Sequence, residues 1–409
     1  MKAMGPIPAG FAANADGVLA IGGRSAFELL ESEGTPLFVY DRAGVERQVA
    51  RFRRAFGEVG LHYAVKANPY PPLLQHMAGL VDGFDLASAG ELGILDEAGL
   101  VGDDLPLSFA GPGKNDSDLA EAVLRGVCVH VESEGELDRL LGIASVMERR
   151  ARIGVRVNPP FGLKGSGMKM GGLASQFGID HERVAAAVRR IIAAGAEWRG
   201  LHVYAGSQSL SADALIESQR ETVALAGQIA AEVGASPPEV NLGGGFGIPY
   251  FAGDAPVDVD AVGATLAMTL RSLPPLLGDT RFVIELGRWL VGECGVYLTR
   301  VIDRKVSRGK TFLVVDGGLH HMLAASGNFG QLLRRNYPVA VANRFGAEPE
   351  EEVTVVGCLC TPLDLLADEV MLPRAEVGDV IAIFCAGAYG LTASPQAFLS
   401  QGAAREVLV

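Results

Sequence analysis

Lys66 stands where a reactive amine could be presented to a ligand. It closes the apolar run "LHYAVK" and is followed at once by Asn68 and Pro69. A lysine at the end of a strand is most often a surface cation whose aliphatic stem lies on apolar neighbours. Its amine also loses its proton readily on burial, which suits it to form a Schiff base with a carbonyl cofactor such as pyridoxal phosphate (PLP). Lys66 alone does not decide between these two roles.

A glycine-rich turn could hold the phosphate of such a cofactor. The stretch "NLGGGFGIPY" places Gly243, Gly244 and Gly245 directly after an apolar strand. Backbone N–H groups in such a turn can surround a phosphate. In a chain with 53 glycines, the same turn could equally be a tight connection from strand to helix.

The next apolar strand, "FVIELGR", raises the weight of the phosphate interpretation. Glu285 and Arg288 lie on either side of Gly287 in this stretch. A carboxylate facing a pyridine nitrogen would keep that nitrogen protonated, and Gly287 and Arg288 could help hold a phosphate or a substrate carboxylate. An ion pair on the rim of a barrel is the alternative role for the two charged side chains.

These residues need a scaffold that brings strand ends together. Between about residues 60 and 290, eight short β-like runs alternate with segments of helical spacing. The runs are "LHYAVK", "VDGFDLA", "PLSFAG", "VCVHVE", "ARIGVRVN", "GLHVYAG", "EVNLGG" and "RFVIEL". Eight parallel βα units predict a closed (β/α)₈ TIM barrel with its functional groups at the C-terminal strand ends. Lys66, Ser88, Asn158, Ser207 and Glu285 all occupy such ends.

After residue 295 the pattern changes to alternating strands with turn residues between them, as in "KTFLVVDGG", "EEVTVVGCLC" and "DVIAIFCAGAYG". This predicts an all-β domain of the sandwich or barrel type. We expect the barrel to span residues 35–290 and the β domain to combine residues 1–34 with 291–409.

The overall composition and charge favour a protein that acts on small molecules. With 35 Lys and Arg against 48 Asp and Glu, the net charge of −13 disfavours binding to nucleic acid or to an anionic membrane. The chain has no apolar run of membrane-spanning length and no convincing signal peptide, so we expect a cytoplasmic protein. Five scattered cysteines suggest reduced thiols, and the pair Cys358 and Cys360 has no partner pair at zinc-finger spacing, so no metal site is expected.

Nine motifs give the chain an extensive resemblance to the fold-type III PLP-dependent decarboxylases, the group of diaminopimelate, ornithine and arginine decarboxylases. In family order, between residues 35 and 400, they are "YAVKAN", "FDLASAGEL", "FAGPGK", "HVYAGSQ", "NLGGGFG", "IELGR", "VVDGG", "CLCTPLD" and "AGAYG". The resemblance implies a lyase that removes CO₂ from an amino acid. An alanine racemase, which resembles the barrel, carries arginine opposite the ring nitrogen, so Glu285 favours decarboxylation.

The resemblance also implies a role for each matched residue. Lys66 would carry PLP, Ser207 with the three turn glycines would bind its phosphate, and Glu285 would meet the ring nitrogen. Arg288 and Tyr389 would contribute to phosphate or substrate binding. Cys360 would reach across a homodimer interface into the partner's site, where it or the released Lys66 returns a proton to Cα.

Departures from the family pattern bear on the substrate. Diaminopimelate and ornithine decarboxylases have Glu or Asp after the catalytic cysteine, matched to a distal ammonium, and this chain has Thr361. Ala324 lies near the place of the arginine that grips a distal carboxylate, although Arg334 and Arg335 follow and could replace it. A substrate without a free distal ammonium is therefore expected.

A third departure affects the cofactor ring. Where the family has a stacking histidine, this chain has Tyr204, and strand alternation places His202 on the same face. Tyrosine can stack on the ring but cannot carry a proton as histidine does at neutral pH. His202 is a candidate substrate-site residue or a hydrogen-bonded histidine inside the barrel.

Together with "GMKMGG", "GGLHH" and "CTP", Tyr204 resembles one subgroup, the decarboxylase of butirosin side-chain biosynthesis. Its substrate is glutamate tethered through its side chain to an acyl carrier protein. Lys164 and Lys169 would then face the phosphopantetheine of an acidic carrier. The alternatives are a mobile lid over a small free amino acid, a PLP-dependent racemase, and a PLP carrier without enzyme activity.

Overall fold

The computed structural model describes residues 1–100, 105–165, 168–329, 331 and 333–409. The chain divides into two compact units, which we describe separately. The barrel unit comprises residues 49–247 and 256–287, and the sheet unit comprises residues 1–48, 248–255 and 288–409. Residues 35–48, which the sequence assigned to the barrel domain, belong here to the sheet unit, and the domain boundaries stay a prediction.

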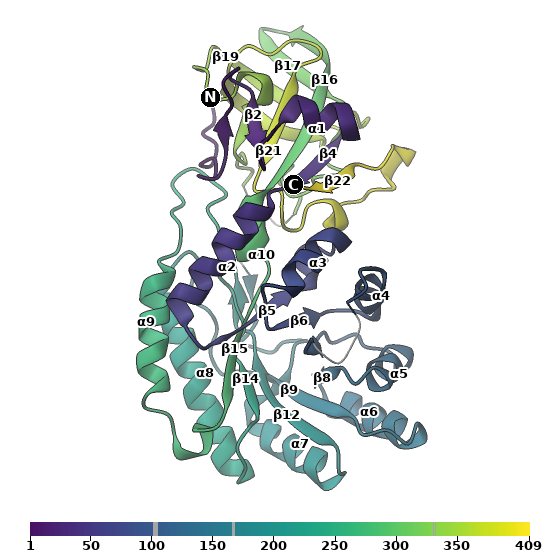
Figure 1. Cartoon of the computed structure of the whole chain (residues 1–409), viewed down its shortest axis with the longest axis vertical. Helices are drawn as coiled ribbons and strands as arrows, with labels where there is room; N and C mark the ends of the chain where they lie inside the picture. Colours follow the sequence, from purple (N-terminus) through teal and green to yellow (C-terminus); the bar gives the residue numbers. More distant parts are fainter. Residues whose placement is uncertain (101–104, 166–167, 330, 332) are drawn as a thin grey trace. The chain divides into compact units, whose positions relative to one another are not determined.

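The barrel unit is a closed ring of eight parallel strands (Figure 1). The strands are β5 (Gly60–Ala64), β6 (Gly83–Leu86), β7 (Leu107–Phe109), β8 (Cys128–Val131), β9 (Arg152–Asn158), β12 (Glu197–Val203), β14 (Glu239–Asn241) and β15 (Arg281–Leu286). They follow the order β9, β12, β14, β15, β5, β6, β7 and β8, and pairing of β8 with β9 closes the ring. The eight predicted runs are these eight strands, which confirms the predicted barrel.

Helices alternate with the barrel strands. They are α2 (Arg42–Phe56), whose start belongs to the sheet unit, α3 (Pro71–Ala78), α4 (Ala89–Glu97), α5 (Asp116–Leu124), α6 (Glu134–Val146), α7 (His181–Ala193), α8 (Ala212–Val233) and α9 (Val259–Leu270). Five begin at a side chain that accepts a hydrogen bond from the first turn: Ser88, Asn115, Ser133 and Ser211 near strand ends, and Asp258 further along the chain from one. The first four caps start a helix within a few residues of a strand end, which keeps the loops at the C-terminal end of the barrel short. Ser88, a strand-end candidate from the sequence, is one of these caps.

Short strands complete the rim of the barrel. β11 (Ile179–Asp180) pairs with the end of β9, and β10 (Met168–Lys169) pairs with β13 (Gly206–Ser207). Asn158, at the end of β9, donates to Asp180 Oδ1 at 2.9 Å and to Leu173 O at 3.1 Å. Asn158 therefore fixes the rim.

The sheet unit is built on an eight-stranded sheet. The main path runs β18 (Val339–Val341), β21 (Val380–Phe384), β16 (Gly295–Ser307), β17 (Lys310–Val315), β19 (Glu351–Val356) and β20 (Leu365–Leu372). β4 (Leu37–Tyr40) pairs with β16 and with β22 (Arg405–Leu408). The all-β part predicted after residue 295 is confirmed.

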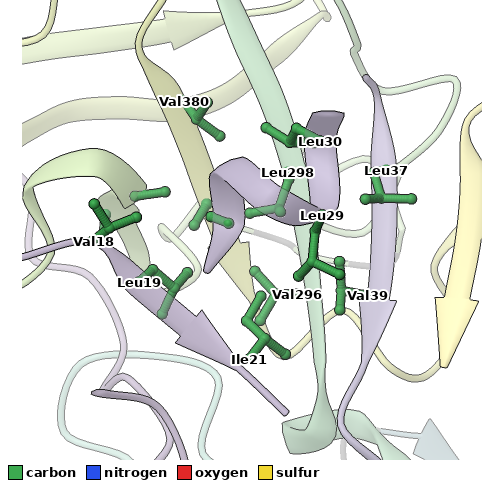
Figure 2. Packing of buried hydrophobic residues seen from close by; sticks show 14 of the residues in the cluster. Val18, Leu19, Ile21, Leu29, Leu30, Leu37, Val39, Val296, Leu298 and Val380 are labelled. Carbon is green, nitrogen blue, oxygen red and sulfur yellow. The ribbon is translucent and has the colours of Figure 1, made fainter. Parts of the chain in front are cut away.

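The first forty residues supply part of the core of this unit. Figure 2 shows apolar side chains from β2 (Leu19–Ile21), α1 (Ala26–Glu33) and β4 packed against β16 and β21. Leu19, Leu29, Leu37 and Leu298 are fully buried there. β2 also pairs with β1 (Ala12–Ala13) and β3 (Arg24–Ser25) in a small separate sheet. The amino-terminal segment is thus part of the sheet unit.

None of the helices in the described ranges is both long enough and apolar enough to cross a membrane.

Candidate active site

Lys66 and Glu285 meet because their strands are neighbours in the barrel. Lys66 lies in the 3₁₀ turn Val65–Ala67 after β5, and Glu285 lies near the end of β15, the parallel neighbour of β5. Lys66 Nζ is 3.9 Å from Glu285 Oε1. At Gly287 a Cβ atom would lie 2.7 Å from Ala67 Cβ, so glycine lets the end of β15 approach the lysine turn. The predicted meeting of these strand ends is observed.

Glu285 is a buried carboxylate held by cationic and polar neighbours. His202 Nε2, from β12, lies 2.9 Å from Glu285 Oε2, and Asn241 Nδ2, from β14, lies 3.4 Å from the same oxygen. Burial would raise the pKa of Glu285, but His202 and then Lys66 outweigh that effect and hold this pKa well below its usual range. Glu285 is therefore ionised at neutral pH.

Tyr204 presents an aromatic face beside the lysine. Lys66 Nζ lies 5.4 Å from the centroid of the Tyr204 ring. The ring of His202 lies 6.5 Å from the same ring in an edge-on arrangement. His202 is 2 % exposed, so it is a histidine of the barrel interior that also contacts Glu285.

The glycine turn offers bare backbone to a ligand. Gly243 and Gly245 have φ of 69° and 86°, which a residue with a side chain adopts only under strain. A Cβ at Gly244 would lie 2.0 Å from Glu285 O. Among the described residues, the amides of Gly244 and Gly245 have no acceptor. Close approach of the backbone therefore requires glycine in this turn, and two of its backbone N–H groups are available to a ligand.

Ser207 is joined to this turn through the backbone. It ends β13, and the residues that follow pair with the glycine stretch: Ser209 N donates to Gly245 O, and Gly247 N donates to Ser209 O, both at 2.8 Å. The serine and the spare amides thus belong to adjoining segments at one end of the barrel.

A pocket of about 310 Å³ opens among these side chains. Its lining includes Lys66, His202, Glu285 and two residues that the sequence reasoning missed, Asp85 and Arg156. Its volume lies in the range of small-molecule sites. Arg156 pairs with Glu132 at 2.9 Å between Nη1 and Oε1. The signal that could have revealed both missed residues is a charged residue inside an otherwise apolar strand.

Arg288 and Tyr389 come together in the sheet unit. Arg288, the first residue of α10 (Arg288–Val291), donates from Nη1 to Tyr250 Oη at 2.8 Å. Its guanidinium carbon lies 4.6 Å from the centroid of the Tyr389 ring. Tyr389 has a φ of 53°, an unusual value for a residue with a side chain. Burial would lower the pKa of Arg288, but Tyr250 and Tyr389 raise it above its usual value.

The loop of Cys360 and Thr361 is organised by Asp364. Asp364 Oδ1 accepts from Leu319 N at 2.6 Å, and Asp364 Oδ2 accepts from Leu359 N at 2.8 Å. Cys360 is exposed and Thr361 is half-buried. Leu363 N donates to Thr361 Oγ1 at 3.3 Å. The hydrogen bonds to Asp364 thus fix the loop, and the Cys360 thiol is exposed to solvent.

The comparison with known proteins decides the family. A sequence profile of the pyridoxal-dependent decarboxylases, for their pyridoxal binding domain, matches residues 42–292. The chain belongs to this family. It is a PLP-dependent amino-acid decarboxylase, as the sequence motifs predicted, and its cofactor is PLP.

Individual relatives of this decarboxylase are similar along most of their length. The L-glutamyl-BtrI acyl-carrier protein decarboxylase of Niallia circulans is 35% identical over 381 residues, 91% of this chain and 88% of the relative. The diaminopimelate decarboxylase of Archaeoglobus fulgidus is 36% identical over 384 residues, 93% and 89% of the two chains. The crystal structure of diaminopimelate decarboxylase from M. jannaschii with L-lysine has a TM-score of 0.88 at 25% identity, covering 98% and 93%.

The C-terminal end of the barrel has the features that PLP requires, in the pocket and in the glycine turn beside Glu285. The spare amides of Gly244 and Gly245 suit a phosphate, and the buried anion of Glu285 suits a protonated pyridine nitrogen. Lys66 lines the same pocket and keeps 43% of its side chain exposed. Within the described ranges, no group of three or more His, Cys, Asp or Glu side chains could hold a metal ion.

Proposed function

We propose that this decarboxylase acts on an amino acid whose side chain is conjugated, as in a glutamyl group on an acyl carrier protein. The observation that carries the proposal is Thr361, which follows Cys360 and offers a hydroxyl where a distal ammonium would need a carboxylate. An ammonium bound there without a counter-charge would cost several kcal/mol. A conjugated side chain has no such charge.

Two acids of the sheet unit, Asp364 in the Thr361 loop and Asp316 after β17, do not replace the missing carboxylate. Both oxygens of Asp364 accept from backbone amides, and Asp364 is 2 % exposed. Asp316 Oδ1 accepts from Thr299 Oγ1 at 2.7 Å and from Arg300 N at 2.8 Å. Both carboxylates are therefore already satisfied.

A handle for a distal carboxylate is absent from the expected place as well. Ala324 is a buried residue without charge. Arg334 Nη2 donates to Leu365 O within the sheet unit. Arg335 stacks on Phe251, with its guanidinium carbon 3.7 Å from the ring centroid. Arg334 is hydrogen-bonded to the backbone and Arg335 is stacked on a ring, so a substrate with a free distal carboxylate is also disfavoured.

We infer the roles of the pocket residues from their positions. Lys66 would hold the cofactor aldehyde, the Gly244 and Gly245 amides with Ser207 would bind the phosphate, and Tyr204 would pack on the ring. PLP, when bound, supplies the sink for the electron pair that remains when CO₂ leaves. Glu285 would keep the ring nitrogen protonated, which suits decarboxylation.

Proton return to Cα is the remaining step for the protein. Arg288 and Tyr389 would position the substrate, and His202 would keep Glu285 ionised. Lys66, once freed, is one candidate donor. Cys360, contributed by the partner subunit of a homodimer, is the other, since its thiol is exposed on a frame fixed by Asp364.

Lys164, which the sequence suggested as a contact for an acidic carrier protein, is paired with an acid of its own chain. Lys164 Nζ pairs with Glu217 Oε1 at 2.7 Å on the surface of the barrel unit, so its charge is already balanced. The alternatives are a decarboxylase of a free amino acid of the diaminopimelate type, which the 36% identical relative favours, and a racemase, against which Glu285 weighs.

The test compares substrates on the purified PLP-loaded enzyme. CO₂ release would be measured with glutamyl-loaded acyl carrier protein, free L-glutamate, diaminopimelate and L-lysine, and loss of optical activity would be followed separately. We expect turnover of the carrier-bound substrate alone, and we expect Thr361→Glu to gain activity on a diamino acid. Equal or faster turnover of a free amino acid by the unmodified enzyme would refute the conjugated-substrate proposal.

A further inference from the structure

The inside of the barrel holds a second cavity below the cofactor pocket. It has a volume of about 30 Å³, enough for at least one water molecule. His62, Ser108 and His130 line it, together with residues at the N-terminal strand ends such as Arg152 and Arg281. The arginine side chains are 37% and 44% exposed, so this floor cavity lies next to solvent at the end of the barrel opposite the pocket.

One side-chain pair joins the two cavities. His62 lines the floor cavity, and Asp85 lines the cofactor pocket with Lys66. His62 Nδ1 lies 3.5 Å from Asp85 Oδ2, at the outer limit of hydrogen bonding. Neither atom has a hydrogen-bond partner among the described residues, so this approach is the one polar contact that either of them makes there. Asp85 Oδ1 accepts from Ser108 Oγ, which also lines the floor cavity.

A glycine in the neighbouring strand leaves space for the buried ring of His62. His62 is 3 % exposed and Asp85 is 7 % exposed. A Cβ at Gly83, in the neighbouring strand β6, would lie 2.9 Å from His62 Nε2, so that strand position is small where the ring needs space. Gly154 in β9 likewise makes room for His130, since a Cβ there would lie 2.2 Å from His130 Cδ2. Bulky branched side chains usually fill such an interior, which makes these polar rings unusual.

We propose that His62 and Asp85 form a proton relay from the floor of the barrel to the cofactor pocket. The inference rests on the proposed decarboxylation, because each turnover breaks the bond between Cα and the carboxylate, releases CO₂ and takes up one proton. The conjugated substrate of the proposed function would fill the mouth of the pocket, and a proton supply from the opposite end of the barrel would then reach the pocket while that substrate is bound.

The relay moves one proton per turnover and involves no redox step. Asp85 first gives its proton to the freed amine of Lys66 in the pocket. The proton on His62 Nδ1 then passes to Asp85 Oδ2, and floor water supplies a proton to His62 Nε2. Exchange with floor water returns His62 to its starting tautomer before the next turnover. The other charged groups that face His62 are Glu239 and Arg281.

The protonation tendencies of the pair agree with this geometry. Burial and the charge of Glu285 raise the pKa of Asp85, so it can hold a proton at a higher pH than an exposed aspartate. Burial would lower the pKa of His62, but Asp85 outweighs it and raises that pKa. A pair of this kind shares a proton between its members.

The kinetic test uses the PLP-loaded enzyme and the substrate that it turns over. His62→Asn is expected to lower kcat by on the order of 10- to 100-fold with little change in KM, to enlarge the solvent deuterium isotope effect, and to be partly rescued by imidazole. Cys128→Ala, which changes the floor lining without touching Asp85, is the control and should behave as wild type. A His62→Asn enzyme with wild-type kcat and isotope effect would overturn the relay.

A second readout does not depend on turnover. Histidine-labelled full-length protein, with and without PLP, would be titrated by NMR to follow the His62 ring. We expect Asp85→Asn to lower the pKa of His62, and an unchanged His62 titration would also overturn the relay. If wild-type enzyme turns over none of the tested substrates, the proposed function fails while this titration still decides the relay.

Discussion

The two carboxylates of the cofactor pocket, Asp85 and Glu285, share one barrel interior but differ in protonation. His202 and Lys66 hold the pKa of Glu285 down, while burial and the charge of Glu285 push the pKa of Asp85 up. Two carboxyl groups whose pKa values are shifted in opposite directions are typical of sites in which one stays ionised and the other acts as an acid. In the proposed mechanism Glu285 is the permanent anion and Asp85 is the proton store.

Glu285→Gln is expected to lower kcat by on the order of 10²-fold, because the amide cannot keep the cofactor nitrogen protonated. The measurement is steady-state CO₂ release together with the PLP content from absorbance. Glu217→Gln, which removes a surface acid paired with Lys164, is the control for the loss of a charge. Full kcat in a Glu285→Gln enzyme that retains PLP would show that the carboxylate has no such role.

The same residue makes stability depend on pH. Since the folded pKa of Glu285 lies below its unfolded value, the unfolded chain binds more protons in acid, and this contribution is present above about pH 4.5 and is lost as pH falls. The loss of thermal stability in Glu285→Gln should thus be constant from pH 7 down to about pH 5 and shrink as pH falls below about 4.5. Thermal unfolding of both proteins across this range checks it, and a loss that grows in acid would contradict the assigned direction.

At the scale of elements, turns and caps do most of the positioning. The glycine turn after β14 fits only because its residues lack side chains, and Asp364 ties the Cys360 loop to the turn that contains Leu319. The side-chain caps start four helices close to the strand ends. Each device acts locally, so each can be perturbed separately.

Gly244→Ala is expected to weaken PLP binding by roughly 10-fold or more, because its Cβ would lie 2.0 Å from Glu285 O and the turn must shift. PLP titration monitored by absorbance gives the affinity. Gly93→Ala in α4 has open space around it and is the matched control, with PLP affinity unchanged and stability equal or higher by up to about 1 kcal/mol. If Gly244→Ala binds PLP as tightly as the control, the turn does not form the phosphate site.

Much of this arrangement could be predicted from the sequence. The eight strands follow from alternation with helical segments, and Lys66 and Glu285 follow from their places at strand ends. Asp85, Arg156 and His62 could not be placed, because which side chains from different strands share a pocket depends on the stagger of the barrel. The sequence grouped residues 1–34 with the β domain, but it could not give the individual contacts of β2 and α1 with β16, which is far away in the chain.

At the scale of the whole molecule, one chain carries both parts that the mechanism needs. Lys66 and Glu285 lie in the barrel unit, while Arg288, Tyr389 and Cys360 lie in the sheet unit. We expect a homodimer in which Cys360 serves the partner's site. A dimer of this kind has two shared sites, each built from both subunits.

Mixing two inactive variants tests this arrangement. If Cys360 is the proton donor, Lys66→Ala and Cys360→Ala homodimers each lack a required group at both sites, whereas a mixed dimer has one intact site. Random exchange of subunits should therefore restore about a quarter of wild-type activity. Subunit exchange would be verified by mass spectrometry, and exchanged mixtures that stay inactive would place Cys360 in the site of its own subunit.

The most direct measurement concerns Lys66. The PLP-loaded enzyme would be reduced with borohydride, digested and mapped by mass spectrometry, with Lys66→Ala as the control. We expect the pyridoxyl label on Lys66 and no label at that peptide in the variant. A label on another lysine, such as the buried Lys114, with Lys66 unmodified, would contradict the account.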